Sequence, residues 1–261
     1  MILPSLPWLG TSACGRLAAF AAATIEAGPH GLTNRWVLAG YGAFVLAAIA
    51  FVAVESRARR AMLPLSLFRR RAFASPTLIG LLVNVCFYGL IFLFSLLFQV
   101  QYGDSALTAG LAFVPMTAAI MAANLATSRV IDAIGPPRTI LLGLAGMAVG
   151  CVGLIWTGHA TPYSEIVVQQ VLLGAGLGLL VPPMTASLLQ SVERSRSGVA
   201  SGTLNAMRQT GSLLGIALFG SLIAGGAHFF AGLHDALAIS LALLLVGGLL
   251  TGLLPPSREW E

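Results

Sequence analysis

Arg208 carries a charge inside an otherwise apolar segment of the chain. It lies about ten residues beyond Gly198, or roughly 15 Å along a helix, although the residues between them are largely polar. A charge at that depth in a membrane is costly, so the guanidinium must extend to the nearer interface or face a polar cavity or a partner. The residues alone leave both interpretations open. Asn205, three residues earlier, would share its helix face, whereas Gln209 would not.

Further polar side chains occur inside apolar segments, where they can join helices by hydrogen bonds or contact a small molecule. Asn84 and Tyr88 are four residues apart, so they would share one helix face. Aromatic residues of the same segment could line a site for lipophilic compounds, or pack in the core or against lipid. These aromatic residues are Phe87, Phe92, Phe94 and Phe98. The remaining polar candidates are Asn124, Gln169 and Gln170.

Catalytic chemistry finds no support in the sequence. It contains no nucleophile elbow, zinc-protease helix or phosphate-binding loop. The cysteines Cys14, Cys86 and Cys151 lack metal-ligand spacing, and we expect them to be small packing residues. We therefore predict no enzyme, no cofactor and no metal. The acidic residues all fall at segment ends, in loops or in tails; they are Glu26, Glu55, Asp104, Asp132, Glu165, Glu193, Asp235, Glu259 and Glu261.

The composition predicts the class of protein that must position these residues. Hydrophobic residues make up 57% of the 261-residue chain and charged residues only 9%, with a mean hydropathy of +0.90. A soluble domain carries about 25% charged residues, so we predict an all-α polytopic membrane protein. The net charge of +5 comes from arginines in short clusters between apolar runs. That pattern is typical of membrane-flanking loops and not of a nucleic-acid surface.

A membrane-spanning helix needs about 20 mostly apolar residues, and we predict seven to eight of them. The good candidates are 36–54, 73–100, 107–131, 138–157, 165–190, 199–224 and 235–254, and the poor one is 8–26. The Arg-rich segment 55–72 is amphipathic, so we expect a linker on the membrane surface or a specific lipid site. The predicted parts are a hairpin at 1–54, the linker 55–72, a six-helix bundle at 73–254 and a tail at 255–261.

The arginines also predict an orientation. Placing the linker in the cytoplasm puts nearly all of them on that side, and both chain ends as well, in a plasma-membrane protein. Arg208 then lies in the inner half of its span, Arg35 in an outer loop and Arg16 inside the poor first span. The arginines predicted at the inner face are Arg57, Arg59, Arg60, Arg69, Arg70, Arg71, Arg129, Arg138, Arg194, Arg196 and Arg258.

Glycines and prolines within the segments predict how the helices pack. Four pairs of glycines are four residues apart, a spacing that lets helix backbones approach closely. These pairs are Gly146 and Gly150, Gly174 and Gly178, Gly211 and Gly215, and Gly248 and Gly252. Pro182 and Pro183 should bend the 165–190 helix.

Three stretches resemble a transporter of the major facilitator superfamily, most closely its 14-span drug:proton antiporter branch. In ATSRVIDAIGPPRTILLG, residues 126–143, Asp132, Gly135 and Arg138 match the family's cytoplasmic loop G-x-x-x-D-R-x-G-R-R. The loop departs from that pattern at Ser128, Ala133, Pro136 and Pro137. The stretch 172–217 contains glycines, prolines, a G-x-x-S-G and an R-Q-x-G that are similar to the family's. The segments 8–26 and 36–54 resemble the two linker helices of this branch.

The resemblance implies a six-helix bundle of two inverted three-helix repeats, with the family's N-terminal bundle outside this chain. It implies export of hydrophobic or cationic drugs, driven by the proton gradient in the intact protein. Because no carboxylate lies mid-segment, we expect this chain alone not to couple protons to transport. The expected partners are the lipid bilayer, a hydrophobic small molecule and a second bundle. The implied pathway residues are Arg208, Asn205, Gln209, Asn84, Tyr88, Asn124 and Gln169.

Two alternatives to a working permease stay open. The chain could be a transport-dead remnant of a split gene. It could also be a half-size protein that needs a homodimer or a separate chain for its other half.

Overall fold

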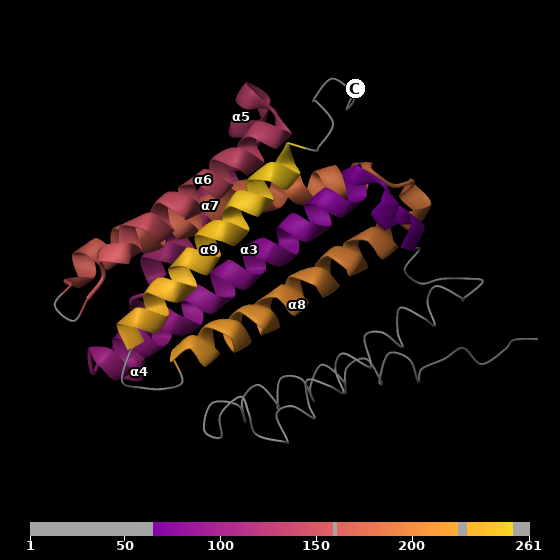
Figure 1. The fold of residues 1–261 in the computed structure, drawn as a ribbon. Helices are drawn as coiled ribbons and strands as arrows, with labels where there is room; N and C mark the ends of the chain where they lie inside the picture. Colours follow the sequence, from indigo (N-terminus) through magenta and orange to yellow (C-terminus); the bar gives the residue numbers. More distant parts are fainter. Residues whose placement is uncertain (1–64, 159–160, 224–228, 253–261) are drawn as a thin grey trace, which may run out of the picture. The chain divides into compact units, whose positions relative to one another are not determined.

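The computed structural model describes residues 65–158, 161–223 and 229–252. The predicted hairpin 1–54, most of the linker and the tail 255–261 lie outside these residues, as does Cys14. Regular secondary structure in the described part is helical throughout, which confirms the predicted all-α class. In chain order the helices are η1 (Leu65–Arg69), α3 (Arg71–Leu96), the π-helical η2 (Leu97–Gln101), α4 (Ala106–Leu111), α5 (Val114–Ile134), α6 (Pro136–Gly153), η3 (Leu154–Trp156), α7 (Tyr163–Gln190), η4 (Arg194–Arg196), α8 (Ser197–Ile223) and α9 (Phe229–Thr251) (Figure 1).

In the described part, 5 helical segments are long and apolar enough to cross a membrane. These spans are Arg71–Gln101, Ala106–Ile134, Pro136–Trp156, Tyr163–Gln190 and Phe229–Thr251. The helix α8 matches the predicted segment 199–224 in extent but is not among them. Its first half carries Asn205, Arg208 and Gln209, which lower its hydropathy. The described part therefore has the architecture of a multi-pass membrane protein.

Two boundaries differ from the sequence-based prediction for physical reasons. The segment 107–131 is divided between α4 and α5 by a turn at 112–113. Pro115, in the first turn of α5, has no N–H to continue the preceding helix but is well tolerated at a helix start. The helix α9 begins at Phe229 and not at 235. His234 and Asp235 are exposed there, so their polar groups do not interrupt the helix.

Two of the three closest helix pairs join helices that are not consecutive in the chain. In α3 and α8, Gly80 lies beside Leu204 and Gly89 beside Phe219, so these two helices are parallel. The helices α5 and α7 form a second parallel pair, and α6 packs antiparallel to α7. The helix α9 packs against α3 and α6, and α3 also touches α7 (Figure 1). Exchanging α3, α5 and α6 for α7, α8 and α9 reproduces these principal contacts, as expected for two inverted three-helix repeats.

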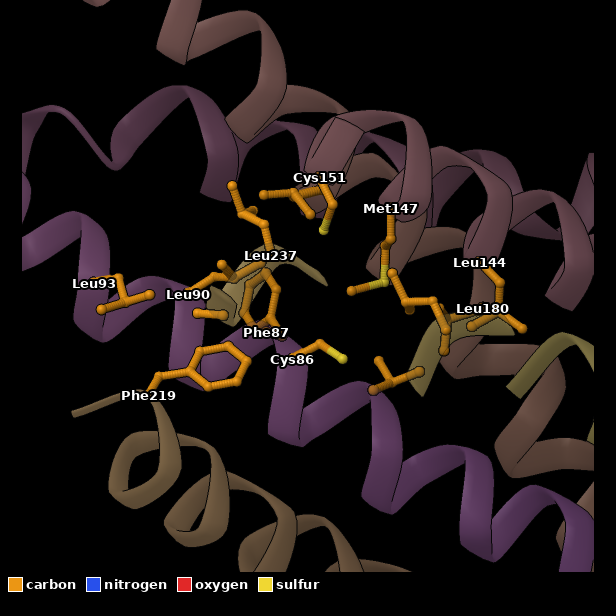
Figure 2. Packing of buried hydrophobic residues seen from close by; sticks show 14 of the residues in the cluster. Cys86, Phe87, Leu90, Leu93, Leu144, Met147, Cys151, Leu180, Phe219 and Leu237 are labelled. Atoms are coloured by element: carbon orange, nitrogen blue, oxygen red, sulfur yellow. The ribbon is translucent and has the colours of Figure 1, made fainter. Parts of the chain in front are cut away.

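A shared apolar core joins α3, α6, α7, α8 and α9 (Figure 2). The cysteines Cys86 of α3 and Cys151 of α6 are buried in it as free thiols, in line with their predicted packing role. The Cys86 thiol lies 3.6 Å from the carbonyl oxygen of Ser240, to which it donates. The other residues labelled in Figure 2 are Phe87, Leu90, Leu93, Leu144, Met147, Leu180, Phe219 and Leu237.

Every arginine of the described residues lies at one end of the bundle or in the adjoining half of a helix. We call this the arginine-rich end and define it by Arg69, Arg70, Arg71, Arg129, Arg138, Arg194 and Arg196. It comprises the start of α3, the α5–α6 connection and the α7–α8 connection. The connections at the other end carry no arginine within the described residues. The described part thus has the one-sided charge pattern expected of a membrane bundle.

Candidate functional site

Arg208 lies within α8, eleven residues beyond its first residue, Ser197. That places it about 16 Å along the helix. Its side chain is half-buried, and a Cβ added to Gly80 of α3 would lie 3.4 Å from its Cγ. The stem of Arg208 therefore packs in the groove that Gly80 opens. No acidic side chain of the described residues forms an ion pair with its guanidinium. The charge of Arg208 is therefore not neutralised by an acidic side chain of the described residues.

The exposed face of α8 brings together the polar residues that flank Arg208. Asn205 and Gln209 are both exposed, and their spacing of four residues places them on one stripe. Gly202 and Ile216 continue the same stripe, and Arg208 lies at its edge. Asn205 and Gln209 therefore belong to one surface, whereas the spacing in the sequence predicted a face shared by Asn205 and Arg208 but not by Gln209. We call this surface the polar stripe of α8.

The exposed face of helix α5 also carries polar residues. Only 17% of the 18-residue apolar stretch within the span Ala106–Ile134 is buried inside the bundle. Asn124 is exposed on α5, with Thr117 and Ser128 also exposed on the same helix. The helices α5 and α8 take equivalent places in the two repeats, each packed parallel to the first helix of the other. Both therefore present polar groups at the surface of an otherwise apolar bundle.

Asn84 and Tyr88 of α3 have different surroundings, although they are four residues apart. Asn84 is 3% exposed, and its side-chain amide donates to the Gly80 carbonyl at 2.7 Å. Its Cβ packs beside Gly211 of α8. Tyr88 is 40% exposed, and its ring packs edge-on against Phe87. In this arrangement Asn84 is a packing residue of the α3–α8 contact, and Tyr88 alone faces outward.

The aromatic residues of α3 mostly pack inside the bundle. Phe87, Phe94 and Phe98 are buried, and Phe92 lies half-buried beside Gly220 of α8. Phe98 centres a cluster of rings with Phe94, Tyr102, Phe113 and Tyr163 at the end opposite the arginines. These contacts favour the packing interpretation over an aromatic-lined binding site.

Tyr102 ties together two connections at the end opposite the arginines. Its hydroxyl lies 3.2 Å from the carbonyl oxygens of both Gly158 and Thr161. Partial burial raises the pKa of the Tyr102 phenol above its ordinary value, so it remains a neutral donor. Tyr163 adds a hydrogen bond of 3.0 Å to the Ala112 carbonyl. The Tyr102 bonds hold the α3–α4 connection against the α6–α7 connection, and the Tyr163 bond holds the start of α7 against the turn between α4 and α5.

Gln169 and Gln170, in the first third of α7, have contrasting environments. The amide end of the Gln169 side chain lies directly against Gly153 of α6. Gln170 is fully buried, and both atoms of its amide group lack a hydrogen-bond partner among the described residues. The interhelical hydrogen bond that its position favoured in the sequence is therefore not formed. A buried polar group without a partner destabilises a fold.

We expect Gln170→Met to stabilise the protein, because methionine keeps the volume and removes the unpaired amide. The gain should be about 1–3 kcal/mol in the free energy of unfolding, measured as a raised unfolding temperature in detergent. Gln169→Met is the matched control, and it should give little gain because Gln169 is not fully buried. A lower unfolding temperature for Gln170→Met would show that the amide has a partner in the membrane.

The glycine pairs form the closest helix contacts. A Cβ on Gly174 would overlap the Met116 carbonyl of α5, and one on Gly215 would overlap the Val85 carbonyl of α3. Gly178 and Gly211 face the same two helices, and Gly146 and Gly150 approach the backbone of α7. Gly248 and Gly252 have no comparably close neighbour. Three of the four predicted pairs therefore lie at tight helix contacts.

Pro182 and Pro183 lie inside α7, which continues as a helix to Gln190. Each proline removes one backbone donor from that helix. Thr127 of α5 contacts α7 in this region through its hydroxyl, at the carbonyl of Gly178. Thr127 was not among the residues predicted from the sequence. The double proline itself was the available signal, because it implies carbonyls that need another donor.

The loop motif forms the α5–α6 connection at the arginine-rich end. Asp132 and Arg138 are exposed, with no ion pair between them. Gly135 joins the two helices with φ 81° and ψ 161°. Its carbonyl accepts a hydrogen bond of 2.8 Å from the Thr139 hydroxyl. Pro136 and the proline after it occupy the first turn of α6, where a missing N–H does no harm.

Gly135→Ala is expected to destabilise the protein by about 1–3 kcal/mol, because this backbone conformation is essentially restricted to glycine. The measurement is the unfolding temperature of the purified chain in detergent. Gly110→Ala serves as the control, since Gly110 lies in α4 with no atom within 4 Å of an added Cβ. That change should be neutral or slightly stabilising. Equal effects of the two substitutions would contradict the assignment of strain to Gly135.

Comparison with known proteins places this bundle in a family. Residues 8–216 match the family model described as Major Facilitator Superfamily. The chain is 35% identical over 234 residues to the methylenomycin A resistance protein of Streptomyces coelicolor, covering 88% of this chain and 49% of that protein. It is 31% identical over 247 residues to the protein of the same name from Bacillus subtilis, covering 91% of this chain and 52% of that protein.

A further relative is the drug efflux pump JefA of Mycobacterium tuberculosis, which is 31% identical over 175 residues, or 67% of this chain and 34% of that protein. The chain thus spans about half the length of the first two relatives. The superfamily consists of transporters and not of enzymes, in agreement with the composition and the helical bundle. The sequence match and the helical membrane bundle agree, and this chain belongs to the Major Facilitator Superfamily.

Proposed function

We propose that the chain is the C-terminal portion of an efflux permease that exports hydrophobic or cationic small molecules. The relatives named as resistance proteins and as a drug efflux pump support the export of drugs. The intact protein would belong to the 14-span branch and use the proton gradient as its energy source. The arginine-rich end would face the cytoplasm of a plasma-membrane protein, following the distribution of positive charge.

The polar surfaces of α5 and α8 carry this proposal. Asn124 on α5, and Asn205 and Gln209 on α8, are exposed from a bundle whose other exposed residues are largely apolar. Polar groups facing lipid are unfavourable, so intramembrane polar residues usually face a cavity or a partner. We propose that a second bundle covers these polar surfaces and that the pathway runs between the two bundles. Arg208 would then lie at the inner half of the pathway, at the edge of the polar stripe of α8.

The test begins with the protein made at its native locus with a C-terminal tag. Immunoblotting gives the length of the product, and a host without drug pumps then reports export of a cationic fluorescent dye. A product larger than 27.0 kDa that exports the dye supports the proposal as stated. Export by a 27.0 kDa product would instead support a half-size protein acting as a homodimer or with a separate partner. No export by any product would support the remnant alternative.

The polar stripe offers a sharper test within an active protein. Asn205→Leu combined with Gln209→Leu should reduce dye export while leaving the amount of folded protein unchanged. Ile216→Leu, on the same stripe but without a polar group, is the matched control. Unchanged export by the double variant would contradict a pathway along this face of α8.

A further inference from the structure

The double proline of α7 leaves two backbone carbonyls without their ordinary donors. In an α-helix the N–H of each residue bonds to the carbonyl four residues earlier. Pro182 therefore deprives Gly178 of its donor, and Pro183 deprives Leu179. The membrane interior offers little water to replace a lost bond. The protein has to satisfy such carbonyls with its own groups.

Thr127 of α5 supplies a donor to one of these carbonyls. Its hydroxyl oxygen lies 3.2 Å from the Gly178 carbonyl oxygen and 2.7 Å from that of Ala123 in its own helix. The residue is 1% exposed, so water does not compete for the hydroxyl. By comparison, the hydroxyls of Thr185, Thr203 and Ser240 bond to carbonyls of their own helices.

Gly178 itself makes this bond possible. A Cβ on Gly178 would lie 2.5 Å from the Ile120 carbonyl oxygen and 2.7 Å from the Ala123 Cβ. The absence of a side chain thus lets α5 approach α7 at the carbonyl that Pro182 leaves open. The close approach, the missing donor and the replacement donor coincide at one point of the α5–α7 contact.

The Thr127 hydroxyl has one hydrogen and two carbonyls within reach. It can donate to Gly178 across the contact or to Ala123 in its own helix. Threonines inside helices commonly bond to the carbonyl four residues back, so the second arrangement is also favourable. The hydroxyl therefore has two arrangements that differ in whether α5 is bonded to α7 at the double proline.

We propose that Thr127 is a positioning residue that holds α7 at its double proline by supplying the donor that Pro182 lacks. When α7 moves at this point, the hydroxyl returns to Ala123 and releases Gly178. The hydrogen bond itself is a property of the bundle. The role in movement rests on the proposed transport function.

A double-mutant cycle tests the hydrogen bond through the unfolding temperature of the full chain in detergent. Thr127→Val removes the hydroxyl at nearly the same volume and should lower the unfolding temperature by about 2–4 °C. Thr127→Ser keeps a donor and should retain most of the stability. Pro182→Ala restores the N–H for Gly178, so adding Thr127→Val to it should cause little further loss. Pro183→Ala restores the donor for Leu179 only, so Thr127→Val should keep its full effect in that background.

Equal effects of Thr127→Val in all three backgrounds would overturn the proposal, because Thr127 would then act by packing alone. If Pro182→Ala fails to fold, equal losses for Thr127→Ser and Thr127→Val would overturn it instead. Export of the cationic dye tests the second half. If Thr127→Val and Pro182→Ala are coupled in stability but Thr127→Val exports the dye as well as the wild type, the role in movement is overturned. If the two are coupled but no variant exports the dye, the wild type included, the hydrogen bond stands and the proposed function is rejected.

Discussion

Replacement of Gly215 by leucine is expected to prevent α3 and α8 from packing and to deplete folded protein from the membrane. A Cβ at this position would overlap the carbonyl group and Cα of Val85, which are backbone atoms that cannot rotate away. The helices would have to separate along a contact that also includes Gly211 against Leu81. Overpacking of this kind costs about 1–3 kcal/mol and sometimes more, which is a large share of the stability of a domain.

The matched control for Gly215→Leu lies in the same helix. Gly202 is exposed on α8, and no atom lies within 4 Å of a Cβ added there. Gly202→Leu should therefore leave the yield and the unfolding temperature close to those of the wild type. Both variants are compared by size-exclusion chromatography and by thermal unfolding in detergent. Similar behaviour of the two variants would mean that the α3–α8 contact is looser than the structure shows.

Arg208→Leu is expected to abolish most export without destabilising the bundle. An arginine within a membrane helix costs about 2.5–3.5 kcal/mol on insertion scales, and no acidic side chain of the described residues compensates it. Removal of the charge should therefore leave stability unchanged or raise it. Export of a cationic dye should fall by roughly tenfold or more, equivalent to about 1.4 kcal/mol of lost stabilisation. Loss of activity with gain of stability would mark Arg208 as functional.

The controls for Arg208 separate its position from its charge. Arg208→Lys keeps the positive charge but replaces the planar guanidinium by a compact ammonium group, and it should retain part of the export. Arg196→Gln removes a cation from the exposed helix η4 at the arginine-rich end and should have little effect. If Arg208→Leu exports as well as the wild type, the side chain simply reaches the interface and takes no part in the pathway.

The membrane class and the helix positions could be predicted from the sequence because they depend on local properties. A membrane helix satisfies its own backbone hydrogen bonds, so a run of apolar residues is enough to predict it. The predicted segment 165–190 became α7, Tyr163–Gln190, and 199–224 became α8, Ser197–Ile223. The glycine pairs Gly174 and Gly178, and Gly211 and Gly215, were likewise expected to lie at close contacts.

Only the tertiary structure decided which helices those glycines meet. The partners of α7 and α8 are α5 and α3, and no local pattern in α8 names a helix more than a hundred residues earlier in the chain. The same limit explains the candidate site. Asn84 and Tyr88 share a spacing, yet the approach of α8 at Gly211 buries the first and leaves the second exposed.

The sequence by itself determined the all-α membrane bundle, its arginine-rich end and the presence of polar groups within apolar helices. The tertiary structure decided the exposure and the hydrogen-bond partners of each polar group. It left Gln170 without a hydrogen-bond partner among the described residues, placed Asn205 and Gln209 on one exposed stripe, and brought the Thr127 hydroxyl to the carbonyl freed by Pro182. The physical reason is that helix formation is settled by bonds within a segment, whereas burial and hydrogen bonding of side chains depend on which distant helix lies alongside.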